Sequence, residues 1–244
     1  MGTVISITSG KGGTGKTSIT GGVAASLALT GRTVLCIDMD IGLRNLDITL
    51  GLNDRALMDF SDVALGRCPL ARAAVGHPDL KGLWLLTSPM SLTASLTPEK
   101  VRALLDTART MYDYILIDSP AGLGTGFRLA TCGADRALVV STNDASSLRD
   151  AQRTVVELDH LRQVHLVMNR IQTRLLRKLR TTIDDAMNAA GLPLIGVVPE
   201  DPQVILCANL GLPLTSRGRR GAALACWNIA QRLEGRRIPI MRIR

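Results

Sequence analysis

Short apolar runs alternate along the chain with longer stretches in which apolar residues recur at helical spacing. The runs predict buried strands over 4–7, 33–37, 83–86, 114–117, 137–140, 166–168 and 194–198. The periodic stretches predict helices over 18–30, 57–65, 69–75, 98–111, 146–161, 175–190 and 221–233. Strands that are apolar throughout and alternate with helices indicate an α/β fold, with a mostly parallel central sheet covered by helices on both faces.

The length of 244 residues suits one large α/β domain. No repeat or long linker divides the chain, so we expect a single domain over residues 1–234 and a short basic and apolar tail over 235–244. Hydrophobic residues make up 46% of the chain, yet no apolar stretch approaches the roughly 18 residues of a membrane span. No charged and then apolar leader precedes the first strand. The expected location is therefore cytoplasmic.

The net charge of +8 comes mostly from arginine and favours anionic partners such as nucleic acid, acidic protein or anionic lipid. Charge alone does not choose among them, and an arginine-rich solvated surface would give the same value. Aromatic residues at 2% leave little for base stacking, which argues against single-strand binding. Five cysteines are scattered without a C-x-x-C pair, so we expect buried free thiols and neither a zinc site nor a disulfide framework.

The segment with the clearest chemistry is 9–17, Ser-Gly-Lys-Gly-Gly-Thr-Gly-Lys-Thr, between the first predicted strand and the first predicted helix. Its spacing fits G-x-x-x-x-G-K-[ST], in the strand-then-helix context that a phosphate-binding loop requires. Glycines let successive backbone N–H groups turn toward an anion, and the positive end of the helix dipole adds to that field. We expect Lys16 to reach the β- and γ-phosphates and the Thr17 hydroxyl to bind Mg²⁺. The predicted phosphate cradle is Gly10, Lys11, Gly12, Gly13, Thr14, Gly15, Lys16, Thr17 and Ser18.

Carboxylates are predicted near the phosphates from two other segments. Asp38 and Asp40 close the second strand-like run, and in an extended segment residues two apart point to the same side. At the carboxyl end of a strand, such a pair can hold the Mg²⁺ shell and orient a water for attack on the γ-phosphate. Asp118 follows the apolar run 114–117 in the Walker B arrangement and is expected to bind Mg²⁺ through water. Gly122 can then offer a backbone N–H to the γ-phosphate.

A second lysine of the loop, Lys11, has no obvious role toward the nucleotide of its own subunit. Lys16 already occupies the direct approach, so a cation at the mouth of the loop is better placed to reach a nucleotide held by a second subunit. A solvated surface charge is the alternative. The pattern K-G-G-x-G-K-T resembles the MinD/ParA family of deviant Walker A ATPases, and this resemblance implies that Lys11 acts across a nucleotide sandwich homodimer. Cys132 lacks the setting of a cluster ligand, which disfavours the nitrogenase iron protein of the same group.

The stretch 38–47 is very similar to the first switch of the MinD branch of this family. The resemblance implies that Asp40 positions the attacking water and that Asp38 supports the metal. It also implies a dimer and partner face at Arg149 and Asp150. The residues that would hold the adenine by the same resemblance are Asn169, Arg170, Pro199, Glu200 and Asp201. An asparagine amide has the donor and acceptor that match the adenine edge.

In functional terms, the resemblance implies a Rossmann-like P-loop NTPase that hydrolyses ATP with Mg²⁺, dimerises when ATP-bound and acts as a spatial switch in division-site placement. Its implied partners are a second copy of the chain and MinC-like and MinE-like division proteins. Three alternatives stay open: a ParA-like partition or cargo-positioning ATPase, a flagellar-number regulator, and an interaction module with negligible hydrolysis. DNA is the less favoured partner. Its candidate contacts are Arg174, Arg177, Arg180, Arg217, Arg219 and Arg220.

The resemblance spans about residues 4–233 and stops before the tail. The family's amphipathic membrane-targeting helix is not recognisable in 235–244, where Pro239 removes a backbone donor. The apolar residues of the tail, which stand among four arginines, are Ile238, Ile240, Met241 and Ile243. We expect a weak, salt-sensitive contact with anionic lipid that requires the ATP-bound dimer and places the protein peripherally at the inner face of the cell membrane. A frayed terminus without a role is the alternative.

Overall fold

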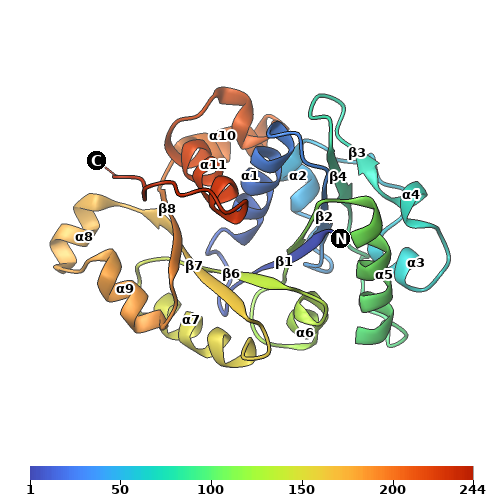
Figure 1. Ribbon diagram of the computed structural model, residues 1–244, viewed down its shortest axis with the longest axis horizontal. Helices are drawn as coiled ribbons and strands as arrows, with labels where there is room; N and C mark the ends of the chain where they lie inside the picture. The colour runs from blue at the N-terminus through green and yellow to red at the C-terminus, as the bar shows by residue number, and fades with distance from the viewer. Residues whose placement is uncertain (244) are drawn as a thin grey trace.

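A single sheet runs through the computed structural model, which describes residues 1–243. Within these residues eight strands form the sheet in the order β3-β4-β2-β5-β1-β6-β7-β8 (Figure 1). Their bounds are β1 Thr3–Thr8, β2 Val34–Asp38, β3 Val75–Gly76, β4 Leu83–Leu86, β5 Tyr114–Asp118, β6 Arg136–Ser141, β7 Gln163–Ile171 and β8 Leu194–Pro199. All neighbouring strands are parallel except the pair β3 and β4. The predicted mostly parallel α/β fold is confirmed.

Helices cover both faces of this sheet, as the continuous apolar strands predicted. The helix bounds are α1 Lys16–Leu29, α2 Leu46–Leu50, α3 Phe60–Ala64, α4 Leu70–Ala73, α5 Pro98–Met111, α6 Thr125–Thr131, α7 Ala145–Glu157, α8 Thr173–Leu179, α9 Ile183–Ala190, α10 Pro202–Asn209 and α11 Gly221–Leu233, with a 3₁₀ turn at Leu214–Arg217. Two consecutive residues of β1 point to opposite faces of the sheet and show the two helix layers. Ile5 packs with α1, α2 and α11, whereas Val4 packs with α3, α4 and α5 on the other face. Helices α7 and α9 extend the second layer over β6, β7 and β8.

The single helix predicted over 175–190 is wrong, because the chain forms two helices there, α8 and α9. Arg180 takes the left-handed conformation, φ 53°, that ends α8. Thr182 then caps α9, since its side chain accepts the Asp185 N–H and the Asp185 carboxylate accepts the Thr182 N–H. This reciprocal cap satisfies donors that a continuous helix would have bonded internally, so the apolar periodicity continues across a real break.

Several element boundaries also differ from the pattern in the sequence. The helix predicted to 161 ends at Glu157, and the strand predicted over 166–168 is the longer β7. Of the stretch predicted as helix over 69–75, the last residue belongs to β3, which pairs with β4. Helices α2, α6 and α10 were not predicted. They are five to eight residues long, too short to show helical periodicity of their own.

The strand order brings the chemical segments together at one edge of the sheet. Strand β1 lies between β5 and β6, and β5 lies between β1 and β2. The phosphate loop after β1 therefore meets the residues that end β2 and β5, where Asp38 is aligned with Asp118 in the strand register. The carboxyl ends of parallel strands are where ligands bind in such sheets. No helix of the described part of the chain combines the length and the apolar character needed to cross a membrane.

The break between α8 and α9 makes a stability prediction. Thr182→Ala should lower the free energy of unfolding by about 1 kcal/mol, because it removes the hydroxyl that accepts the Asp185 N–H and donates to the Asp185 carboxylate. Thr182→Ser keeps the hydroxyl and should stay close to the wild type. Urea unfolding of the three proteins measures this difference, and equal midpoints for Thr182→Ala and wild type would contradict the capped break.

Candidate functional site

The phosphate loop joins β1 directly to α1 and depends on glycine at two of its positions. Gly13 and Gly15 have φ values of 77° and 90°, in the left-handed region that favours glycine. A Cβ added to Gly15 would also lie 2.3 Å from Asn169 Nδ2. The loop therefore turns tightly under the end of β7 and delivers the unpaired N–H groups of the first turn of α1 toward its own centre.

The lysine predicted to reach the phosphates is held inside the loop. Lys16 is 7% exposed, and its Nζ donates to Ser9 Oγ at 3.0 Å. Ser9 Oγ also accepts from Thr14 Oγ1 at 3.1 Å and donates to the Lys11 carbonyl at 2.6 Å. Burial lowers the pKa of Lys16, while the charges of Asp118 and Asp40 act in the opposite direction. The sequence pattern did not single out Ser9 as a partner of this lysine.

Two buried carboxylates stand beside each other at the ends of β2 and β5. Asp38 and Asp118 are each 1% exposed. Burial raises the pKa of Asp118 to about 7 and that of Asp38 to about 6, and the charge of Asp38 adds to the first shift. Thr20 Oγ1 donates to Asp118 Oδ1 at 3.2 Å, and Thr17 also hydrogen-bonds to this carboxylate. Two buried carboxylates this close repel each other when both are ionised, so bound positive charge would stabilise their ionised forms.

Mg²⁺ bound together with a phosphate-bearing ligand would supply positive charge beside these two carboxylates. Among the described residues no group of three or more His, Cys, Asp or Glu side chains could hold a metal by itself. Mg²⁺ is commonly held by one or two carboxylates, with phosphate oxygens and water completing its shell. Thr17, Asp38 and Asp118, the residues predicted for the metal, lie together and supply such a partial donor set.

Asp40 lies at the same edge, but for a different reason than the sequence suggested. Strand β2 ends at Asp38, and Asp40 lies in a bend beyond it, so the prediction that both acids share one extended segment is wrong. The Asp40 N–H donates to Asp38 Oδ1 at 2.9 Å, which turns the chain. Burial raises the pKa of the Asp40 carboxyl and the charge of Lys16 opposes this, so acid and lysine act on each other across the site.

Gly122 lies beyond β5, on the loop that begins with the Asp118 carboxylate. It has a φ of 82°, and a Cβ added there would meet nothing within 4 Å. The loop starts from a fixed point, because the Asp118 carbonyl accepts the Met39 N–H and the Ser119 N–H donates to the Ile7 carbonyl. The loop that carries Gly122 therefore begins at an anchored acid.

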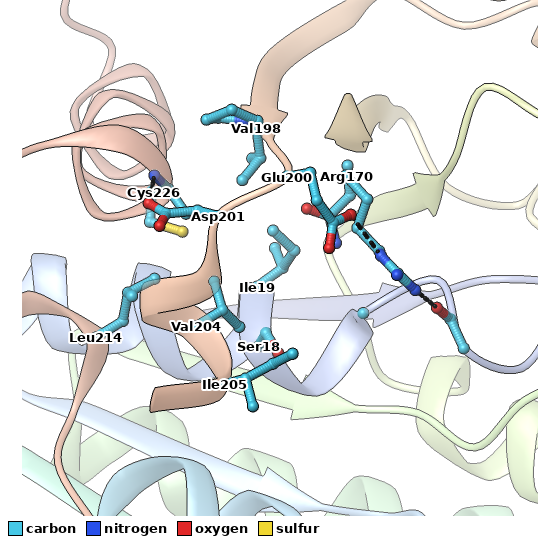
Figure 2. A pocket seen from close by; sticks show the side chains of 15 residues that line it. Ser18, Ile19, Arg170, Val198, Glu200, Asp201, Val204, Ile205, Leu214 and Cys226 are labelled. Atoms are coloured by element: carbon cyan, nitrogen blue, oxygen red, sulfur yellow. Dashed lines mark hydrogen bonds and ion pairs between the residues drawn. The ribbon is translucent and has the colours of Figure 1, made fainter. Parts of the chain in front are cut away.

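A cavity of about 210 Å³ lies against the phosphate loop (Figure 2). Its lining combines apolar and polar residues and comprises Gly13, Gly15, Ser18, Ile19, Asn169, Arg170, Val198, Pro199, Glu200, Asp201, Val204, Ile205, Leu214, Ala222 and Cys226. All five residues predicted to hold the adenine are in this lining. The apolar residues from α1, α10 and α11 were missed, because helical periodicity in α1 and α11 indicates burial but no ligand and α10 was not predicted.

Polar contacts tie this cavity to the phosphate loop. Asn169 Nδ2 donates to the Thr14 carbonyl at 2.8 Å, so one N–H of the predicted adenine reader holds the loop. Arg170 Nε forms a 2.8 Å ion pair with Glu200, as Figure 2 shows. Asp201 caps α10 through the Gln203 N–H and also accepts the Ala222 N–H, each at 2.9 Å. The Asp201 carboxylate therefore holds the cavity wall in place.

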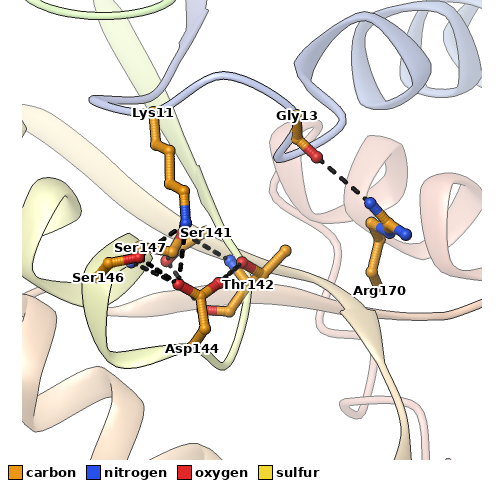
Figure 3. A network of polar contacts seen from close by, with 8 residues as sticks. All are labelled: Lys11, Gly13, Ser141, Thr142, Asp144, Ser146, Ser147 and Arg170. Atoms are coloured by element: carbon orange, nitrogen blue, oxygen red, sulfur yellow. Dashed lines mark hydrogen bonds and ion pairs between the residues drawn. The ribbon is translucent and has the colours of Figure 1, made fainter.

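The second lysine of the loop points away from the cradle (Figure 3). Lys11 Nζ lies 3.1 Å from Asp144 Oδ1 and 2.7 Å from Ser146 Oγ, at the start of α7. Burial alone would raise the pKa of Asp144, but hydrogen bonds from Ser146, Thr142, the Ser147 N–H and Lys11 outweigh it and hold this pKa well below its usual range. Asp144 is the N-cap of α7, which begins at Ala145, one residue before the predicted start of this helix. In the sequence, Asp144 stands three residues before Ser147, whose N–H it accepts, and an acid at this spacing is typical of an N-cap.

Helix α7 also carries the two residues predicted for a dimer and partner face. A Cβ added to Gly10 would lie 2.7 Å from the Asp150 carbonyl, so α7 packs directly against the phosphate loop. Arg149 is exposed, and the Asp150 carboxylate lies 3.8 Å from Arg153. The face is therefore adjacent to Lys11 and open to solvent.

Comparisons with known proteins agree with this geometry. Residues 5–214 match the model of the CobQ/CobB/MinD/ParA nucleotide binding domain. The septum site-determining protein MinD of Bacillus subtilis is 37% identical over 98% of this chain and 92% of its own length. In the MinC:MinD cell division protein complex of Aquifex aeolicus, the similar chain has a TM-score of 0.89 and 37% identity, with 98% of each chain covered. MinD of Pyrococcus horikoshii, complexed with Mg-ADP, has a TM-score of 0.84 and 28% identity, with 96% of each covered. The chain belongs to the MinD/ParA family of nucleotide-binding proteins.

Proposed function

We propose that the protein is a MinD-like ATPase that hydrolyses ATP with Mg²⁺, dimerises when ATP is bound and acts as a spatial switch in placing the division site. The observation that carries this proposal is the convergence of Lys16, Asp38 and Asp118 on one phosphate loop, in a chain that is similar to MinD proteins over nearly its full length. The Mg-ADP complex of the Pyrococcus horikoshii relative supports the choice of nucleotide and metal.

In this mechanism the residues of the chain bind the triphosphate and position water. The backbone N–H groups of the loop and Lys16 hold the β- and γ-phosphates. Thr17, Asp38 and Asp118 would hold Mg²⁺, which would neutralise charge on the phosphate oxygens. Asp40, partly exposed beside Lys16, orients the attacking water. Gly122 donates its N–H to the γ-phosphate and so links hydrolysis to movement of its loop.

The base would occupy the apolar cavity beside the loop. Its walls from α1, α10 and α11 suit a flat ring, and Asn169 offers an amide oxygen at the polar side. Pro199, Glu200 and Asp201 line the cavity where the chain passes from β8 into α10, and Arg170 holds Glu200. This arrangement supports adenine as the base.

Dimerisation and partner binding would use the face formed by the loop and α7. Lys11 is held at an exposed position by Asp144, from which it can move to the phosphates of a second subunit. Arg149 and Asp150 lie on the same helix and would form part of the composite surface. The MinC:MinD complex of the Aquifex aeolicus relative supports a MinC-like partner, and a MinE-like partner is proposed with it.

A ParA-like function on DNA remains the second candidate because of one helix. Helix α8 has no buried residue and carries Arg174, Arg177 and Lys178. Such a basic, exposed helix could follow a phosphate backbone. The tail is a second basic surface, since Arg236, Arg237 and Arg242 are exposed, and it suits an anionic lipid surface.

Nucleotide binding should depend on Lys16. Lys16→Ala removes the buried cation of the cradle and should weaken ATP binding by at least about 100-fold, because the phosphate charge is left unpaired. Lys81→Ala, at an exposed lysine far along the chain, is the matched control and should bind normally. Isothermal calorimetry with Mg-ATP gives both affinities. Near-normal affinity of Lys16→Ala would rule out the assigned cradle.

Asp40 and Lys11 should separate hydrolysis from dimerisation. Asp40→Ala should bind ATP and dimerise while turnover falls by about 100-fold or more, since the water loses its base. Lys11→Ala should bind ATP yet stay monomeric. Light scattering with ATP and phosphate release measure the two steps, with Asp54→Asn as a control at an exposed acid. Normal dimerisation and turnover of Lys11→Ala would show that Lys11 only pairs with Asp144 of its own subunit and has no role across the dimer.

Sedimentation with ATP distinguishes the two anionic partners. We expect the protein to sediment weakly with anionic liposomes at low salt and to dissociate at high salt, because screening shortens the reach of the tail arginines. Neutral liposomes are the control. ATP-dependent binding to random duplex DNA, with a steep salt dependence, would instead favour the ParA-like function.

A further inference from the structure

The C-terminal segment does not extend into solvent but returns along the edge of the sheet. After α11 the chain runs past β8 toward α8 without regular secondary structure (Figure 1). Arg232, near the end of α11, fixes this course with three donated hydrogen bonds. Its Nε bonds to the Ile238 carbonyl at 3.0 Å, its Nη2 to the Pro239 carbonyl at 2.6 Å and its Nη1 to the Ile195 carbonyl of β8 at 2.7 Å.

Apolar side chains of the segment face a groove in the body of the protein. Ile240, Met241 and Ile243 line a cavity of about 490 Å³. The rest of its lining comes from the last strands and the α8–α9 pair, and includes Ile171, Leu176, Ile183, Met187, Leu194 and Val197. Met241 packs against the core layer of α1 and α11, and Ile243 against the layer of α7 and α9. The segment therefore covers the edge strand β8, which has no neighbouring strand on that side.

The same two strands build the nucleotide cavity. On β7, Asn169 and Arg170 line the nucleotide cavity while Ile171 lines the groove of the tail. On β8, Val197 lines the groove while Val198 lines the nucleotide cavity. The pairing between β7 and β8 is irregular at this point, and Arg170 has a φ of 56°. The groove and the cavity are thus two sides of one irregular strand pair.

One backbone contact joins the two sides directly. The Glu200 N–H, in the wall of the nucleotide cavity, donates to the carbonyl of groove-lining Ile171 at 3.1 Å. Glu200 in turn holds Arg170, whose Nη1 donates to the Gly13 carbonyl of the phosphate loop at 3.5 Å. A chain of contacts therefore links Ile171 in the groove to Gly13 in the phosphate loop through Glu200 and Arg170.

We propose that residues 238–243 form a strap that binds the groove of β7, β8, α8 and α9, and that strap docking and nucleotide binding strengthen each other. The strap holds the irregular strand pair in the arrangement that the nucleotide cavity needs, and a bound nucleotide holds the same arrangement for the strap. Linkage requires the two effects to be equal in size. The inference rests on the proposed function, because it takes nucleotide binding at this cavity as given.

Tryptic cleavage of the tail tests one direction of the coupling. Trypsin cuts after Arg236, Arg237 and Arg242, which are exposed. Saturating Mg-ADP should slow release of the tail from the wild-type protein by about fivefold, at the lower end of coupling between sites. In Arg232→Gln, which loses the clamp, Mg-ADP should leave the release rate unchanged. Mass spectrometry of the large fragment separates cuts in the tail from cuts elsewhere.

Nucleotide affinity of full-length variants tests the other direction. The double variant Met241→Ser with Ile243→Ser, and separately Arg232→Gln, should bind Mg-ADP about fivefold more weakly than the wild type by calorimetry. Arg237→Gln is the matched control, because it changes an exposed arginine of the same segment that lacks a hydrogen bond to the groove in the described structure. Circular dichroism confirms that each variant is folded.

The outcomes separate the strap from the function on which it rests. Failure of the wild-type protein to bind Mg-ADP would contradict the proposed nucleotide function and the coupling with it. Normal binding by the wild type, with unchanged affinity in both tail variants and cleavage that ignores Mg-ADP, would overturn the strap alone. Weaker binding in both variants together with protection of the tail supports the proposal.

Discussion

The arrangement of the site depends on two carboxylates that the fold buries side by side. Asp38 and Asp118 end adjacent strands in register, and burial raises the pKa of both. A lysine inside the neighbouring loop opposes only part of their charge, and its own pKa is lowered by burial. Burial at the end of the sheet thus raises the electrostatic cost of ionising both carboxylates, and a bound divalent cation would lower that cost. Binding of Mg²⁺ and nucleotide together would relieve an electrostatic cost already present in the folded chain.

The two lysines of one loop have opposite environments, and this difference supports the separate roles proposed for them. Lys16 is enclosed and bonded to Ser9, so it can serve only a ligand that enters the loop. Lys11 is exposed and held by Asp144, an acid whose carboxylate is stabilised by several donors. An ion pair at the surface contributes little to stability, so exchanging Asp144 for the phosphates of a second subunit costs little. One short sequence can therefore provide binding within a subunit and sensing between subunits.

The edge pair β7 and β8 contributes residues to two surfaces, the nucleotide cavity and the groove of the tail. Its irregular pairing presents Asn169 and Arg170 to the nucleotide cavity and Ile171 to the groove of the tail. The apolar residues of the tail, read from the sequence as material for a membrane surface, are partly covered by that groove. Arg236, Arg237 and Arg242 of the tail are exposed, so electrostatic attraction to an anionic surface does not require the strap to leave.

The sequence by itself determined the sheet, the order of its principal elements and the residues of the phosphate loop, because apolar runs and a contiguous nine-residue motif are local signals. It also pointed to Asp40 and Asp118 near that loop, and the resemblance named five residues that line the neighbouring cavity. Tertiary structure alone decided that Ser9 holds Lys16, that Asp144 holds Lys11 and that Arg232 clamps the tail, since these pairs join separate elements or depend on how the loop closes. It also decided the break at Arg180, where capping bonds outweighed a continuous apolar period. Periodicity reports which face of a segment is buried, whereas side-chain partners are fixed only when distant segments meet.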